Sequence, residues 1–83
     1  MASGGSTHEK RTCRVPAAFV CLERSGRMVD IPPGDCILEE GQNFVAICWE
    51  TSAGRQRAEV ASESVRELIR WGKLTLGPLV SRG

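Results

Sequence analysis

The chain has no tyrosine, and its 83 residues include only two phenylalanines, two tryptophans and one histidine. Because the single histidine, His8, lies in the polar segment Met1–Thr12, no Ser-His or Cys-His pair for nucleophilic catalysis is expected. No apolar run approaches the roughly 20 residues of a membrane-spanning helix. Met1–Thr12 also lacks the apolar centre of a signal peptide, so a cytoplasmic protein with no membrane contact is expected.

The charges are nearly balanced. Eleven basic and ten acidic side chains give a formal net charge of +1, so no global field draws the chain to nucleic acid or to an anionic membrane. Hydrophobic residues make up 41% of the chain, which is ordinary for a globular protein of one domain. Only a local basic patch is left as a route to nucleic acid.

The four cysteines include no Cys-x-x-Cys pair, the spacing from which zinc sites usually take two ligands. A Gly-rich phosphate loop is also missing, so neither a metal nor a cofactor is expected. Three of the cysteines lie in apolar strand candidates, where thiols of a cytosolic protein are usually buried and reduced. Reduced thiols are the favoured state, with disulfides as the alternative, for Cys13, Cys21, Cys36 and Cys48.

Composition divides the chain into three parts. Residues 1–12 are rich in Gly, Ser and Thr and are expected to form a disordered tail. Residues 13–77 alternate apolar runs with Gly- and Pro-containing turns, which indicates a small β-barrel domain. Residues 78–83 are expected to be a C-terminal tail.

Apolar and alternating runs predict the strands. The first strand, Arg14–Glu23, is limited at its start by Pro16, because proline cannot donate to a strand ladder. Phe44–Glu50 is the strongest candidate, being almost wholly apolar with β-branched and aromatic residues. The remaining strands are expected at Met28–Ile31, Cys36–Glu40, Gln56–Ala61 and Lys73–Leu76.

The segment Ser62–Trp71 is expected to form a short helix or 3₁₀ turn. Ser64 followed by Glu67 has the spacing of a capping box, and Ser62 is the alternative N-cap. Gly72 supplies the left-handed residue that commonly ends a helix. One apolar stripe with helical spacing is expected to face the core, formed by Val65, Leu68 and Ile69.

The stretch Val60–Leu68 resembles the part of SH3-like small barrels in which a strand, a helical turn and an apolar anchor follow one another. Pro33-Gly34-Asp35 before an apolar strand is similar to turns in many such barrels. The resemblance covers residues 13–77 and implies a mainly β fold, a small five-stranded SH3-like barrel with one short helix before the last strand. Val15–Leu68 also looks like small bacterial proteins of unknown role.

One SH3-like relative is an enzyme, the plasmid-type dihydrofolate reductase, which works as a tetramer around one pore. Its pore-lining strand carries a Val-Gln-Ile-Tyr motif, whereas the corresponding stretch here, Arg57–Val60, reads Arg-Ala-Glu-Val. The resemblance therefore does not carry that activity over. No catalytic residue is assigned and the chain is expected not to be an enzyme, with an oligomeric enzyme that forms its site at a subunit interface as a remaining alternative.

An acidic stretch contains no basic residue between Met28 and Phe44. Paired carboxylates serve general acid–base chemistry, and several converging oxygens bind divalent cations. Charged residues are mostly exposed, so solvated surface is the favoured interpretation. The stretch contains Asp30, Asp35, Glu39 and Glu40.

Two strand candidates, Ala18–Leu22 and Phe44–Trp49, are apolar on both faces, but a small barrel has only one interior. The surplus apolar surface indicates a homo-oligomer or a protein partner, and the preferred function is a self-associating protein-interaction module. Trp71 either covers the rim of the core or is an exposed anchor, since Trp and Arg are enriched in interface hot spots. The expected partner-binding residues are Trp71, Arg70, Arg57 and Phe44.

Nucleic-acid binding is the second interpretation. Basic residues beside a tryptophan could contact phosphates and stack on bases. However, Glu59, Glu63 and Glu67 interleave with the arginines in the pattern of an ordinary solvated helix face. The candidate nucleic-acid residues are Arg55, Arg57, Arg66, Arg70 and Lys73.

Overall fold

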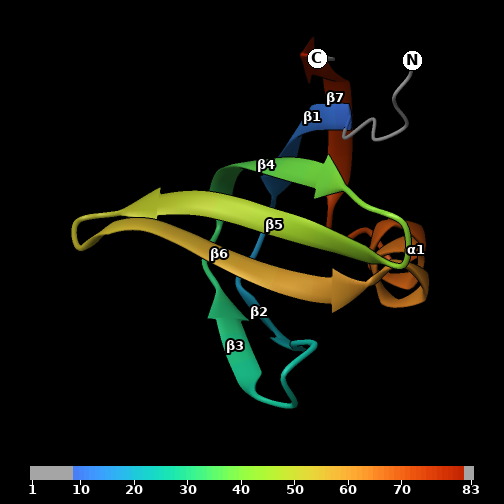
Figure 1. Cartoon of the computed structure of the whole chain (residues 1–83). Coiled ribbons are helices and arrows are strands. Elements are labelled where there is room, and N and C mark those ends of the chain that lie inside the picture. Colours follow the sequence, from blue (N-terminus) through green and yellow to red (C-terminus); the bar gives the residue numbers. More distant parts are fainter. Residues whose placement is uncertain (1–8, 82–83) are drawn as a thin grey trace, which may run out of the picture.

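The structure is a computed structural model that describes residues 9–81. In this range the chain forms strands joined mostly by short turns, with a helix between the last two strands (Figure 1). The elements are β1 (Glu9–Val15), β2 (Phe19–Leu22), β3 (Met28–Ile31), β4 (Gly34–Glu40), β5 (Phe44–Thr51), β6 (Gly54–Ala61), α1 (Ser62–Arg70) and β7 (Thr75–Ser81).

The strands form two separate sheets. Five of them make one antiparallel sheet in the order β6-β5-β4-β1-β7, and β2 pairs only with β3 in a hairpin. The large sheet is not closed, because β6 and β7 are its two edges and no ladder joins them. The mainly β class with one helix before the last strand is confirmed, but the closed SH3-like barrel is not.

The expected first strand, Arg14–Glu23, is two strands. β1 ends at Val15 and β2 begins at Phe19, with Pro16 in the break between them. Proline has no N–H for the ladder, so the chain leaves the five-stranded sheet there and starts the hairpin. Pro16 was expected to limit the start of the strand, but the expected strand still continued through it.

Both expected tail boundaries fall inside strands. β1 already begins at Glu9 and β7 continues to Ser81, so the expected closing strand, Lys73–Leu76, lies too early. Residues 9–15 pair along β4, and β7 pairs in turn with β1, which gives the terminal segments partners that local composition does not reveal. Residues 1–8 and 82–83 of the expected tails lie outside the described range.

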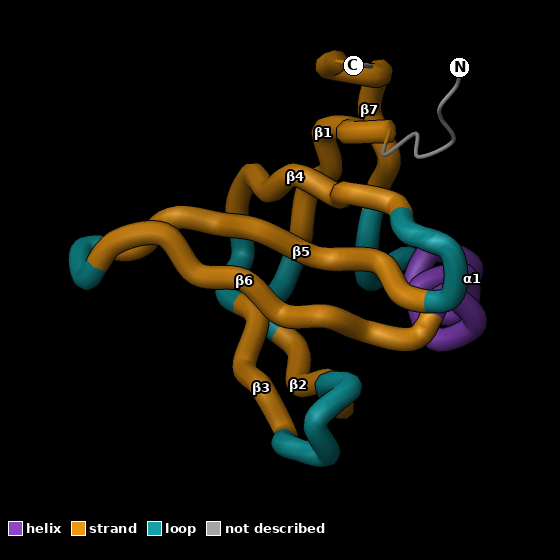
Figure 2. The backbone as a smooth tube through the Cα atoms, in the orientation of Figure 1, coloured by secondary structure: helices purple, strands orange, loops and turns teal. Residues whose placement is uncertain are grey.

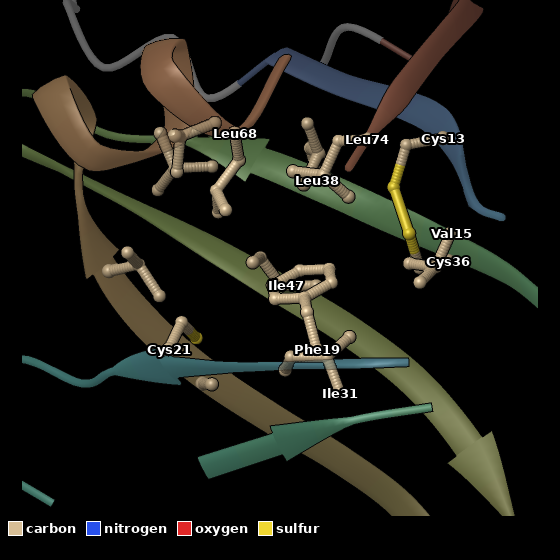
Figure 3. Close-up of a cluster of buried hydrophobic side chains, with 14 residues drawn as sticks. Cys13, Val15, Phe19, Cys21, Ile31, Cys36, Leu38, Ile47, Leu68 and Leu74 are labelled. Atoms are coloured by element: carbon tan, nitrogen blue, oxygen red, sulfur yellow. A yellow bond between two sulfur atoms is a disulfide. The ribbon is translucent and has the colours of Figure 1, made fainter. Parts of the chain in front are cut away.

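The core lies against one face of the five-stranded sheet, which is called the inner face below (Figure 3). Phe19 and Cys21 of β2 and Ile31 of β3 cover this face from the hairpin, and Leu68 covers it from α1. The alternation expected for β4 and β6 is confirmed, because their core-facing residues are buried between more exposed ones. The buried sheet residues include Val15, Leu38, Val45, Ile47, Ala58 and Val60.

Helix α1 follows β6 without an intervening loop. Its N-cap is Ala61 and no side chain caps it, so the expected capping box is wrong. Instead, the backbone N–H of Ser62 donates to the carbonyl of Asn43 at 3.0 Å, in the β4–β5 loop beside the helix (Figure 2). The helix ends as expected: Gly72 is left-handed with φ of 77°, and the N–H of Lys73 donates to the Leu68 carbonyl at 2.8 Å.

The contact between β1 and β7 requires a residue without a side chain at position 77. A Cβ on Gly77 would overlap the Thr12 hydroxyl, which itself donates to the Pro78 carbonyl at 3.2 Å. We expect Gly77→Ala to lower the free energy of unfolding by about 1–3 kcal/mol through overpacking. In a Thr12→Ala background the same change should cost much less, as measured by urea unfolding; equal costs in both backgrounds would contradict the contact.

Candidate protein-interaction surfaces

The outer face of the five-stranded sheet points away from the core and is lined by charged residues. Strand register places Ala46 between Glu39 and Glu59, and Cys48 beside Arg57. Ala46 is buried and Cys48 is half-buried, although both lie on this face. The second apolar face expected for β5 is therefore largely covered by side chains of its neighbours.

Four charged side chains form a continuous chain of ion pairs on this face. Arg57 bridges Glu39 and Glu59 at 3.1 Å each, and Glu59 also pairs with Arg24 at 3.1 Å. Arg24 comes from the hairpin turn, where its backbone N–H donates to the Glu59 carbonyl at 2.7 Å. Its guanidinium lies 4.7 Å from the centroid of the Phe44 ring, a cation–π geometry. The network thus joins the hairpin to the edge of the large sheet.

These contacts shift the ionisation of two members. Hydrogen bonds from Arg57 and then Arg24 lower the pKa of the Glu59 carboxyl. Hydrogen bonds to Glu59 and Glu39 raise the pKa of the Arg57 guanidinium. Both shifts favour the charged forms, so the network is intact at neutral pH.

The Glu59 contacts predict a pH-dependent stability. Because the folded pKa is lower than the unfolded value of about 4.3, ionised Glu59 stabilises the fold above that value. This contribution disappears as the pH falls through the folded pKa. We expect the difference in Tm between the wild type and Glu59→Gln to be largest at neutral pH and to vanish in acid. The control Glu63→Gln changes an exposed glutamate of α1 and should show no such trend.

Two of the expected partner-binding residues belong to this network. Phe44 and Arg57 both line a shallow pocket of about 330 Å³, together with Arg24. Phe44 is half-buried beneath Arg24, and both guanidiniums are ion-paired. Arg70 and Trp71 are not among the residues that line this pocket.

Among the side chains that the structure describes, three exposed apolar ones lie together on the outward face of the β2–β3 hairpin. Val20, Leu22 and Met28 are 53%, 58% and 63% exposed, whereas Phe19 and Cys21 alternate with them and are buried. Leu22 and Met28 are direct cross-strand partners. Val20, Leu22 and Met28 are called the hairpin patch below. The two-faced apolar character of the Ala18–Leu22 run was the sequence signal for it.

Trp71 is exposed rather than part of the core rim. It follows the last residue of α1, is 63% exposed, and its backbone N–H donates to the Glu67 carbonyl at 2.9 Å. Arg70 and Lys73 flank it and are exposed as well. Arg70, Trp71 and Lys73 are called the Trp71 surface below.

The candidate nucleic-acid residues are divided between two elements. Arg55 and Arg57 lie on β6 and pair with Glu50 at 3.6 Å and with the network glutamates. Arg66, Arg70 and Lys73 lie on α1 or just after it. Within residues 9–81, no carboxylate lies within ion-pair distance of these three.

The cysteines do not share one state. Cys13 and Cys36 form a disulfide, so the expectation of reduced thiols is wrong for this pair. They are direct partners in the β1–β4 ladder with a Cα–Cα distance of 5.2 Å, within the range that disulfides span. Cys21 and Cys48 are free, and burial raises the pKa of the Cys21 thiol, with a smaller effect from Glu23.

The acidic residues expected at the surface are exposed or ion-paired. Asp30 and Glu40 are exposed, Asp35 lies 3.7 Å from Arg14, and Glu39 belongs to the network. In the described part of the chain, no three His, Cys, Asp or Glu side chains come together as metal ligands do. Residues 9–81 also contain no helix long and apolar enough to cross a membrane.

Comparisons of the chain with protein-family models, with curated proteins and with solved structures give no match.

Proposed function

We propose that the chain is a non-enzymatic binding module that associates with itself through the exposed apolar side chains of its hairpin. The observation that carries this proposal is the hairpin patch, in which Val20, Leu22 and Met28 are each more than half exposed on one face. Single exposed apolar residues are ordinary, whereas adjacent ones on a rigid ladder mark interaction sites.

The hairpin holds these side chains in fixed positions. Its inner residues, Phe19, Cys21 and Ile31, are buried in the core, so the outward residues cannot turn inward without disrupting the ladder. The Arg24 backbone and side chain also tie the hairpin turn to Glu59 of β6. A surface that is ordered before binding has less conformational entropy to lose on association.

Replacing Leu22 with glutamate tests the proposal directly. The change places a charge in the middle of the hairpin patch, and we expect it to abolish self-association in light scattering. Leu79→Glu is the matched control, because Leu79 is also exposed, at 48%, but lies on β7. Assembly that survives Leu22→Glu unchanged, in a variant that unfolds like the wild type, would contradict the proposal.

Nucleic-acid binding is favoured by one observation, the three basic side chains Arg66, Arg70 and Lys73 near the exposed Trp71. Arg55 and Arg57 add little to it, because ion pairs within the sheet already engage them. Affinity for single-stranded RNA or DNA that falls steeply with added salt would support this second function. The absence of binding at low salt would contradict nucleic-acid binding as a function.

A further inference from the structure

Two exposed apolar surfaces lie on different parts of the molecule. Helix α1 lies beside the start of β5 and the end of β6 (Figure 1). The Trp71 surface follows α1 in the chain, whereas the hairpin patch lies on the separate β2–β3 ladder. Trp71 is a single large side chain held by the backbone at the helix end. The hairpin patch offers several smaller side chains side by side on a ladder. Trp and Arg are enriched among the residues that dominate binding energy at interfaces, and such residues are packed against side chains that exclude water.

The charges of the two surfaces are opposite. Asp30 stands directly across from Val20 on the outward face of the hairpin, and it is exposed. Arg70 and Lys73 flank Trp71. Within residues 9–81, no ion pair engages Asp30, Arg70 or Lys73. In a contact between the two surfaces, Asp30 of one copy would meet Arg70 or Lys73 of the other.

We propose, on the basis of the self-association above, that the contact is heterologous: the Trp71 surface of one copy docks on the hairpin patch of the next. Trp71 packs against Val20 and Leu22, and Arg70 or Lys73 reaches Asp30. Arg27 lies at the turn, next to Met28. Because Arg27 repels Arg70 and Lys73 of the other copy, these two side chains reach Asp30 from the end of the patch away from the turn.

The alternative pairing of like surfaces is electrostatically poorer. Two Trp71 surfaces face to face would bring together Arg70 and Lys73 of both copies. Two hairpin patches that met with Asp30 against Asp30 would bring two carboxylates together, because the exposed Arg27 of each copy lies at the turn rather than beside Asp30. Like-charge juxtaposition across an interface opposes association, whereas complementary charges favour it.

A heterologous contact leaves one free surface at each end of an assembly. Such contacts form rings when the rotation between copies closes and open chains when it does not. The two surfaces can therefore be disabled separately. Mixing the two resulting variants restores a heterologous contact but not an isologous one.

The test mixes two variants, each lacking a different surface. Leu22→Glu disables the hairpin patch and keeps Trp71, whereas Trp71→Ala disables the Trp71 surface and keeps the patch. Each variant alone should be monomeric. Their mixture should form a dimer with one chain of each kind and nothing larger, which native mass spectrometry resolves because the two chains differ in mass. Both positions are exposed, so both variants are expected to fold. Unfolding curves of each variant check this.

Three results overturn the inference in distinguishable ways. A monomeric wild type refutes both self-association and its geometry. A wild type that assembles while the mixture remains monomeric leaves the proposed function standing and refutes the heterologous contact. The same conclusion follows if Trp71→Ala alone assembles like the wild type.

Charge reversal is a second readout. Asp30→Lys should weaken assembly by about tenfold at low salt, because it removes the attraction and adds repulsion. Asp35→Lys is the control, because Asp35 lies on the outer face of the large sheet beside Arg14. Equal effects of the two reversals would refute the pairing at Asp30.

Discussion

Replacing Cys13 and Cys36 together with alanine is expected to lower the free energy of unfolding by about 3 kcal/mol. The bond links positions 23 residues apart, and a crosslink of this span restricts the unfolded chain by about that amount. For a chain of 83 residues this is a large share of the total stability. Urea unfolding at fixed protein concentration measures the change.

The control for this prediction is Cys48→Ala, which removes a free and half-buried thiol. We expect it to cost much less than the double replacement. A reducing agent should shift the wild-type midpoint toward that of the double variant and leave the double variant unchanged. A wild type that is insensitive to reductant would show that the Cys13–Cys36 bond does not contribute to stability.

The second large effect is expected at Ile31, which is fully buried on the inner face of the hairpin. Ile31→Ala should lower the free energy of unfolding by about 2–5 kcal/mol, because it removes buried methyl groups and leaves a cavity. Met28 is the matched position, on the same strand but 63% exposed. Met28→Ala should change stability by no more than about 0.5 kcal/mol.

The comparison of Ile31 with Met28 tests which face of the hairpin is in the core. It is made at low protein concentration, because self-association would itself stabilise the folded state. If the two replacements cost the same, the hairpin is not ordered as described. The hairpin patch would then lose its structural basis.

The sequence was sufficient to predict most of the local structure. The alternation in Gln56–Ala61 and Cys36–Glu40 predicted which residues face the core, and both strands are confirmed. The helix was predicted within one residue at its C-terminal end, because Gly72 is an unambiguous stop signal. Its start was predicted for the wrong reason, because α1 continues directly from β6 and has no side-chain cap.

What the sequence could not predict depends on contacts between distant residues. The Cys13–Cys36 bond follows from the register of β1 with β4, which no spacing of cysteines reveals. The same holds for Arg24, whose contact with Phe44 crosses from the hairpin turn to the sheet. That contact covers the surface on which Phe44 was expected to bind a partner.

The surplus of apolar residues was predicted correctly for one strand and only in part for the other. The outward side chains of β2 are exposed, as the two-faced Ala18–Leu22 run indicated. Those of β5 are half-buried or buried, because charged side chains of β4 and β6 flank Ala46 and Cys48. Composition alone cannot distinguish an apolar face covered within the chain from one left for a partner.

The central claim is that the chain associates with itself, and its mass in solution across a concentration series tests this most directly. Sedimentation equilibrium of the wild type, with and without reductant, should give a mass that rises above the 9.0 kDa of one chain as concentration increases. The predicted result is a mass above that of one chain for the wild type, and the mass of one chain for Leu22→Glu, which disables the hairpin patch. A mass of one chain at every concentration would contradict the account.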